Sequence, residues 1–245
     1  MKSLLALILV FTLGTALLNS CSGSSMSDAA VEPTQVAYSP DELFARSQER
    51  MANIQSGAFS ATTDVTHLGT SLTIRQEGLI ESPDRSYVKT TGVAGIQSNE
   101  VLTDHGKFCI RIGNAQGWSE FKDPNPQFGF LSRLQDYQAA PKGLTALADT
   151  TQAGVRVHRI TGTLDADDAT ALLPPGLGVS YSNMVADYYI GIEDPILWRT
   201  DVSFEMQVPN TPLPARAKAT YTFSRIDEKI TLPTHVPQTC DERRL

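Results

Sequence analysis

The chain has 245 residues, of which 41% are hydrophobic and 19% are charged, with 17 Gly and 14 Pro. This composition is typical of a globular protein of one large or two small domains, and it excludes collagen-like, coiled-coil and wholly disordered chains. A formal net charge of −7 argues against the basic surface that binds polyphosphates, so nucleic acid is excluded as the main partner.

The first 20 residues have the features of a lipoprotein signal peptide. Lys2 precedes an uncharged, mostly apolar run of about 15 residues, Leu4 to Leu18, which fits the roughly 7–15-residue core of a secretory signal and is too short to span a bilayer. The run ends in Leu18-Asn19-Ser20-Cys21, which resembles the box that directs lipid attachment in bacterial lipoproteins. We expect residues 1–20 to be removed and Cys21 to carry the lipid. The alternative is an ordinary cleaved signal with an incidental cysteine.

The segment after this cysteine is predicted to be a flexible tether. Residues 21–38 contain Ser, Gly, Pro and Ala without an apolar period, which is typical of a linker. No other segment of the sequence approaches membrane-spanning length. We therefore expect an exported protein that is anchored to the cell membrane by the lipid on Cys21 and faces the periplasm or the cell exterior.

Lipidation of one cysteine leaves a pair, Cys109 and Cys240, in a compartment where disulfides persist. Within 107–112, Cys109 alternates with apolar residues and is expected on the outward face, and Cys240 lies in a polar C-terminal tail, 236–245. Packing then requires neither thiol, and we predict a disulfide that clips the tail across the outer face of the sheet. Two buried free thiols are the alternative.

The folded part is expected to begin with a helix. Ser39-Pro40-Asp41-Glu42 has the pattern of a capping box with proline in the first turn and acidic groups at the positive end of the helix dipole. Apolar spacing extends the predicted helix to about Gln55, with Gly57 just past its end.

Beyond this helix the apolar period changes to two. In 196–208 the even positions are mostly apolar and the odd ones mostly polar, and 216–225 alternates in the same way. Long strands with one wet face predict an antiparallel sheet. The expected strands are 57–67, 71–81, 107–112, 153–164, 184–192, 196–208 and 216–225.

Two stretches interrupt the strands with helical spacing. The first is 128–140, continued by 143–148, and the second is 165–173, which Pro174 and Pro175 close. Such helices can cover the apolar face of a curved sheet. We therefore predict an α+β fold with a single domain at 39–235.

The order of these pieces resembles that of bacterial lipoproteins with the half-barrel fold of the mycobacterial lipid-binding group, the LppX/LprAFG-like proteins, which are related in architecture to periplasmic lipoprotein carriers of the LolA/LolB type. The segments that carry the resemblance are the box at Cys21, Gly57-Ala58-Phe59-Ser60, Glu77-Gly78-Leu79-Ile80, Pro83-Asp84-Arg85, Gly117-Trp118 and the closing run Tyr221 to Pro233. The resemblance implies a strongly curved antiparallel sheet, a half-barrel, whose concave apolar face is covered by helices. It also implies a cavity for the acyl chains of lipids or lipoproteins.

By this resemblance the protein binds or carries a lipid or another apolar ligand, with the membrane as a partner through the anchor and other envelope proteins as further partners. A structural or interaction lipoprotein with a dry core and no ligand is the alternative. Asp187 and Asp201 depart from a wholly apolar lining, although the alternation places Asp201 opposite Trp198. The residues expected to line the cavity are Phe108, Ile110, Phe128, Leu131, Leu134, Trp198, Val202, Phe204, Met206, Ala219, Tyr221 and Phe223.

Catalytic patterns are missing from the sequence. The four histidines, at 67, 105, 158 and 235, have no metal-site spacing, and there is no nucleophile elbow or glycine-rich phosphate loop. Asp165-Ala166-Asp167-Asp168 lacks the glycine and the terminal glutamate of a calcium loop, so helix capping explains it better. We expect a protein that is not an enzyme and uses no cofactor or metal.

Overall fold

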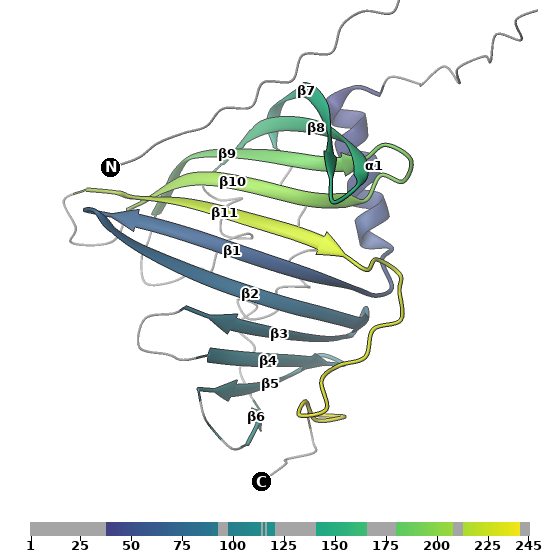
Figure 1. Ribbon diagram of the computed structural model, residues 1–245, viewed down its shortest axis with the longest axis vertical. Helices are drawn as coiled ribbons and strands as arrows, with labels where there is room; N and C mark the ends of the chain where they lie inside the picture. The colour runs from purple at the N-terminus through teal and green to yellow at the C-terminus, as the bar shows by residue number, and fades with distance from the viewer. Residues whose placement is uncertain are drawn as a thin grey trace, which may run out of the picture. The chain divides into compact units, whose positions relative to one another are not determined.

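The computed structural model describes residues 38–92, 98–113, 115, 117–120, 141–165, 180–207 and 213–240. These residues form one helix and eleven strands (Figure 1). The elements are α1 (Pro40–Ala52), β1 (Gly57–His67), β2 (Thr70–Ser82), β3 (Arg85–Thr91), β4 (Ser98–Asp104), β5 (Lys107–Ile112), β6 (Ser119–Glu120), β7 (Lys142–Gln152), β8 (Val155–Leu164), β9 (Ser180–Gly191), β10 (Leu197–Gln207) and β11 (Ala215–Ser224).

All eleven strands belong to a single antiparallel sheet in the order β6-β5-β4-β3-β2-β1-β11-β10-β9-β8-β7. The first and last strands of the chain therefore pair in the middle, β1 with β11, and the sheet stays open because β6 and β7 form its two edges. In Figure 1 the β7–β8 edge bends toward the side on which α1 lies. The predicted antiparallel sheet is confirmed.

Helix α1 begins as predicted and ends earlier. The Ser39 side chain accepts a hydrogen bond from the Glu42 amide, and the Glu42 carboxylate accepts one from the Ser39 amide, which completes the capping box. The helix stops at Ala52 because Asn53 already leaves the helical conformation, and its N–H reaches back to the carbonyls of Arg50 and Met51. The expected extension to Gln55 is wrong, since Gly57 opens strand β1 instead of capping the helix.

The register divides the sheet into two faces. Phe59 pairs with Gly78 on one side and with Phe223 on the other, and the face that these residues share is called the inner face. Helix α1 packs on it through Leu43 and Phe44, and the Phe44 ring meets the Tyr188 ring edge-on with centroids 4.8 Å apart. The opposite face is called the outer face.

The inner cluster is the buried apolar core on the inner face. It joins α1 to the strands from β1 through β11 to β8, with one residue from β3. Its members are Leu43, Phe44, Phe59, Ala61, Val88, Ile160, Leu164, Met184, Ala186, Tyr188, Ile190, Leu197, Val202, Phe204, Ala217, Ala219, Tyr221 and Phe223.

A second core, the outer cluster, lies on the other face over β3–β5. After β11 the chain turns and passes the ends of β2, β3 and β4, as Figure 1 shows, and buries apolar side chains against β3–β5. The members of the outer cluster are Tyr87, Leu102, Cys109, Trp118, Ile230, Leu232, Val236 and Cys240.

The helices predicted after β1 are not observed among the described residues. Residues 143–148 belong to strand β7, which pairs with β8, so the helical continuation expected there is wrong. The helix expected at 128–140 and nearly all of the one at 165–173 lie outside the described residues. Strands β3 and β4, which the alternation did not predict, are seven residues each.

Candidate functional site

The inner face brings together most of the residues expected to line a cavity. Val202, Phe204, Ala219, Tyr221 and Phe223 lie side by side on β10 and β11 in the inner cluster, none more than 5% exposed. Their common direction follows from the alternation, because Val202 pairs with Ala219 and Ala219 is two residues from Tyr221. Leu43 and Phe44 of α1 belong to the same cluster.

A β-bulge changes the direction of one expected residue. The pairing of β10 with β9 shifts between Leu197 and Arg199, so an extra residue enters β10 and the alternation is broken at that point. Leu197 joins the inner cluster, and Trp198, half-buried, is not a member. The strict parity that placed Trp198 inside therefore fails at the start of the strand and holds from Thr200 onward.

The other half of the inner face is less completely covered. Val101 pairs with Ile110 and Thr103 with Phe108, and the register carries these side chains onto the same face as the inner cluster. Val101, Phe108 and Ile110 are each half-buried. Three further residues expected at the cavity, Phe128, Leu131 and Leu134, lie outside the described residues.

Partly buried side chains extend the inner cluster toward the ends of its strands. Val65, Met206 and Tyr181 pack against the cluster, and the rings of Tyr181 and Phe204 meet edge-on with centroids 5.7 Å apart. Burial raises the pKa of the Tyr181 hydroxyl. The alternation placed Val65 and Met206 on the apolar faces of their strands, but only Met206 was expected at the cavity, and Tyr181 lies outside the predicted strand 184–192.

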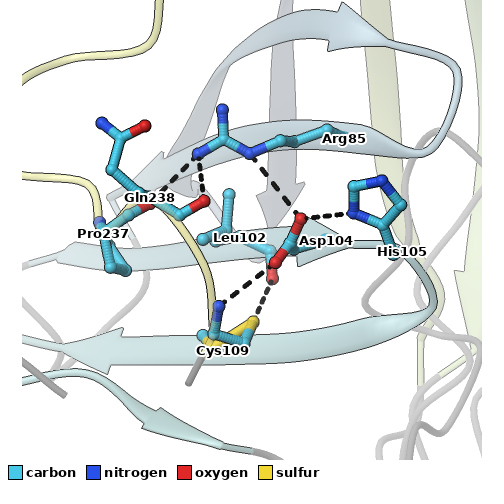
Figure 2. Close-up of a disulfide and its surroundings, with 8 residues drawn as sticks. Arg85, Leu102, Asp104, His105, Cys109, Pro237 and Gln238 are labelled. Atoms are coloured by element: carbon cyan, nitrogen blue, oxygen red, sulfur yellow. Dashed lines mark hydrogen bonds and ion pairs between the residues drawn. A yellow bond between two sulfur atoms is a disulfide. The ribbon is translucent and has the colours of Figure 1, made fainter. Parts of the chain in front are cut away.

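The outer face carries the predicted disulfide, between Cys109 and Cys240, whose Cα atoms are 5.7 Å apart (Figure 2). The bridge clips the C-terminal segment across the outer face of the sheet, as expected. The expectation that packing requires neither cysteine is wrong, because Cys109 is 1% and Cys240 5% exposed within the outer cluster. The alternation correctly placed Cys109 on the outer face, but it gave no sign that another segment covers that face.

Charged groups of β3 and β4 hold the main chain of the same segment. Arg85 Nη2 donates to the carbonyls of Pro237 and Gln238 at 3.1 and 3.0 Å, and the Cys240 amide donates to Asp104 Oδ2 at 3.2 Å (Figure 2). Asp104 also lies 3.7 Å from Arg85 Nε and 2.8 Å from His105 Nδ1. The tail is thus fixed by side chains from β3 and β4 as well as by the disulfide on β5.

A buried glutamate on β4, Glu100, contacts the C-terminal segment through His235. Glu100, 5% exposed, lies 2.6 Å from Arg111 Nη2 and 3.0 Å from His235 Nε2. Burial opposes its ionisation, but the hydrogen bonds from Arg111 and His235 outweigh burial and hold the pKa of this carboxyl below its ordinary value. Trp118 Nε1 donates to the His235 carbonyl at 3.3 Å.

The outer face of β8–β10 carries paired charges. Asp187 and Asp201 stand opposite each other on β9 and β10. Arg159 lies 2.5 Å from Asp187, and Arg199 donates twice to Asp201, at 2.9 and 2.8 Å. Burial acts to raise the pKa of Asp187, but the bonds from Arg159 and Thr161 lower it overall. Both aspartates therefore lie outside the apolar lining.

Within the described ranges, no group of three or more His, Cys, Asp or Glu side chains is arranged to hold a metal ion. The same residues contain no helix that is long and apolar enough to cross a membrane. The chemistry that these residues offer is apolar contact on the inner face and charge pairing on the outer face.

Comparisons with known proteins give a fold. No protein-family model matches the chain, and no curated protein matches it. Among solved structures, LprF from Mycobacterium bovis aligns over 81% of this chain and 97% of its own with a TM-score of 0.55 and 12% identity. The lipoprotein LppX of Mycobacterium tuberculosis aligns over 79% and 98% with a TM-score of 0.52 and 15% identity.

This chain has the fold of LprF and LppX. The open antiparallel sheet implied by the sequence resemblance is therefore confirmed, whereas its cover of several helices stays a prediction. The identities are too low for the likeness to show more than the fold. A LolA superfamily protein from Nitrosomonas europaea also aligns, over 80% of this chain and 96% of its own, with a TM-score of 0.34 and 9% identity.

Proposed function

We propose that the domain at 39–235 is a non-catalytic, extracytoplasmic lipid-binding module, held at the cell membrane by a lipid on Cys21. The observation that carries the proposal is the fold shared with LprF and LppX over about four fifths of the chain, together with an inner face that carries apolar side chains on both of its halves. One of those solved structures is named a lipoprotein. A paired set of cysteines is also typical of an oxidising compartment outside the cytoplasm.

The ligand site is assigned to the half of the inner face formed by β3–β5. Across β8–β11 the inner face carries the fully buried residues of the inner cluster, in which Ala219 is 0% exposed. Across β3–β5 the apolar side chains Val101, Phe108 and Ile110 are half-buried, so an acyl chain gains contact there without displacing the core.

Uptake of a labelled fatty acid tests the binding proposal. The chain from residue 22 onward, without leader or lipid anchor, is titrated with dansyl-labelled undecanoic acid, and native mass spectrometry of the same preparation looks for lipid carried over from the cell. We expect saturable uptake, because burial of apolar area drives the binding of acyl chains. An empty protein that takes up no label would favour the alternative, an envelope lipoprotein with a dry core.

Two matched variants locate the site. Val101→Trp fills the inner face of β4, and Val185→Trp places the same ring on the outer face, where Val185 is 44% exposed. We expect Val101→Trp to weaken uptake by about tenfold or more and Val185→Trp to leave it unchanged. Equal uptake by both variants would place the ligand elsewhere.

The anchor has its own test. Cys21→Ser removes the thiol to which the lipid would be attached, so the protein should leave the membrane fraction or retain its signal peptide. A lipid with two or more acyl chains anchors stably, whereas one chain binds marginally. If the Cys21→Ser protein sediments with membranes like the wild type, and both have the same mature mass, the anchor proposal is wrong.

A further inference from the structure

The two ends of the strands differ in polarity. Strands β1, β3, β5, β8 and β10 end where β2, β4, β9 and β11 begin, and this end of the sheet is called the rim. Six large apolar residues are exposed in the described part of the chain, and four of them lie near the rim. They are Leu68 at 68%, Leu72 at 38%, Ile112 at 53% and Leu213 at 53%.

The opposite end of the sheet presents charge. Its turns between β2 and β3, β4 and β5, and β9 and β10 expose Asp84, His105, Glu193 and Asp194. Polar contacts link side chains at this end: His105 Nε2 lies 2.9 Å from Asp84, and Arg50 Nε lies 3.0 Å from Asp194. The large exposed apolar side chains of the described residues therefore gather at one end of the sheet, which also carries the exposed ion pair between Lys142 and Asp165.

One rim residue occupies a position that its side chain disfavours. Leu68 and Gly69 form the tip of the β1–β2 hairpin with φ of 47° and 79°, a two-residue turn in which both residues have positive φ. Asn-Gly and Asp-Gly are the preferred pairs in such turns, and a leucine there is uncommon. Because Leu68 is also 68% exposed, it contributes neither turn preference nor core packing.

The apolar rim is continuous with the interior. Leu72 pairs across the strands with Val65 on the inner face, and Val65 packs against the inner cluster. Met206 and Tyr181 pair with each other near the same ends of β10 and β9 and pack on that cluster too. An acyl chain that entered at the rim beside β2 would first meet Leu72 and Val65 on the inner face.

From these observations we propose that the rim rests on the surface of a lipid bilayer, with Leu68, Leu72 and Leu213 inserted at the boundary between headgroups and acyl chains. The apolar side chains project from separate turns and strand ends, which suits insertion into a fluid boundary better than docking on a rigid, complementary surface. Exposed arginines flank them: Arg75 follows Leu72 on β2, and Arg216, with 85% of its side chain exposed, follows Leu213. Cations near the surface favour anionic lipid headgroups.

The predicted tether permits this orientation. The 18 residues from Cys21 to Tyr38 reach at most about 60 Å when extended. An 11-residue strand such as β1 is only about 37 Å long, so an anchored chain can place either end of the sheet on the membrane. The inference rests on the proposed function, since its role is to pass lipid between the bilayer and the inner face.

Vesicle sedimentation of turn variants tests the rim. All described elements and both clusters lie between Tyr38 and Cys240, so the chain from residue 22 onward carries the described fold without its anchor. It is mixed with vesicles of phosphatidylcholine alone and of phosphatidylcholine with phosphatidylglycerol at 7:3. Leu68→Asn installs the preferred turn residue and removes the apolar side chain. We expect it to lower the vesicle partition coefficient by about tenfold while the unfolding temperature stays the same or rises.

The matched control is at the other end of the sheet. Ala153 and Gly154 form the β7–β8 turn with φ of 47° and 85°, the same geometry as the Leu68 turn, so Ala153→Asn makes the equivalent change away from the rim. We expect Ala153→Asn to partition like the wild type, and Leu68→Asn/Leu213→Asn to lose about a hundredfold.

Three results would overturn the inference. They are no sedimentation of the wild type with either vesicle, equal sedimentation of Leu68→Asn and wild type, and a wild-type dimer by light scattering that Leu68→Asn converts to a monomer. The last result would assign the rim to a second copy of the chain. Uptake of dansyl-labelled undecanoic acid separates this inference from the proposed function, because a protein that takes up the label and ignores vesicles refutes only the rim.

Discussion

The two buried clusters lie on opposite faces of one sheet and are held by different means. The inner cluster joins regular elements, and its members are apolar or aromatic side chains from α1 and the long strands. The outer cluster is closed by an irregular segment, and it is bordered by buried charges, Glu100 and Asp104, and by a disulfide. The inner cluster therefore depends on shape and volume, whereas the outer cluster depends on a few specific bonds that can be removed one at a time.

The largest expected effect comes from removing the disulfide. The bridge joins residues 131 positions apart, and a loop of this length is worth roughly 4–5 kcal/mol in the chain-entropy model, with about 2–5 kcal/mol usual for native disulfides. Cys109→Ala/Cys240→Ala should lower the free energy of unfolding by this order in a denaturant titration. The hydrogen bonds from Arg85 to Pro237 and Gln238 remain, so the tail should loosen without unfolding the inner cluster.

Two measurements sharpen that result. In the wild type, alkylation of the folded, non-reduced protein should add no mass at Cys109 or Cys240, and two alkylated cysteines per chain would eliminate the bridge. In the double variant, limited proteolysis should cut within 225–240 before it cuts the strands of the inner face. Unchanged stability would mean that the noncovalent contacts of Ile230, Leu232 and Val236 hold the segment by themselves.

Overpacking tests the inner cluster. Ala219 is fully buried between Val202 and Thr63 in the pairing of β11 with β10 and β1. Ala219→Trp should lower the free energy of unfolding by about 3 kcal/mol, because a packed core has no room for an indole ring. Ser203→Trp, at an exposed position on β10, is the matched control and should change it by less than about 0.5 kcal/mol. Equal unfolding temperatures in the two variants would indicate a cavity beside Ala219.

A glycine on the inner face explains why two of the sequence segments behind the family resemblance occur together. Phe59, of Gly57-Ala58-Phe59-Ser60, pairs with Gly78, of Glu77-Gly78-Leu79-Ile80, and a Cβ on Gly78 would fall on the Phe59 ring. Gly78→Ala should cost about 2 kcal/mol in thermal or chemical unfolding because the buried ring must move. In a Phe59→Leu background, Gly78→Ala should lower the free energy of unfolding by less. If the two substitutions have additive effects in a double-mutant cycle, the contact between these residues is refuted.

These residues also mark how far the sequence could predict the fold. Strands β1, β10 and β11 were predictable because each has one face in the inner cluster and one in water, which fixes the period of two. Helix α1 was predictable because its cap is a local motif. The alternation failed at the bulge beside Trp198, where an extra residue reverses the parity without a change in composition.

The outer cluster could not be predicted from the sequence, for a different reason. Its cover, 225–240, has no regular secondary structure, so Ile230, Leu232 and Val236 have no period that distinguishes them from a solvated tail. The disulfide could be predicted from cysteine number and compartment, but the burial of both cysteines could not, because it depends on where that segment folds back. Apolar residues after the last alternating strand were the one signal available.

The smallest expected effect is the pH dependence of the outer cluster. The pKa of the buried Glu100 carboxyl is lowered by Arg111 and His235, so this group binds fewer protons in the folded chain than in the unfolded chain. Its contribution to stability is therefore full above the ordinary value for Glu of about 4.3, falls as the pH drops through that value, and is gone below the lowered pKa. Glu100→Gln should lower the free energy of unfolding by about 1 kcal/mol at pH 7 and flatten its decline as the pH falls below about 4.3. Glu77→Gln changes an exposed glutamate in the same cross-strand row. This variant should keep the wild-type profile in urea titrations at matched pH.

A Glu100→Gln protein that loses stability in acid as steeply as the wild type would show that other carboxylates control the acid response, and that the charges around His235 position the segment without stabilising it.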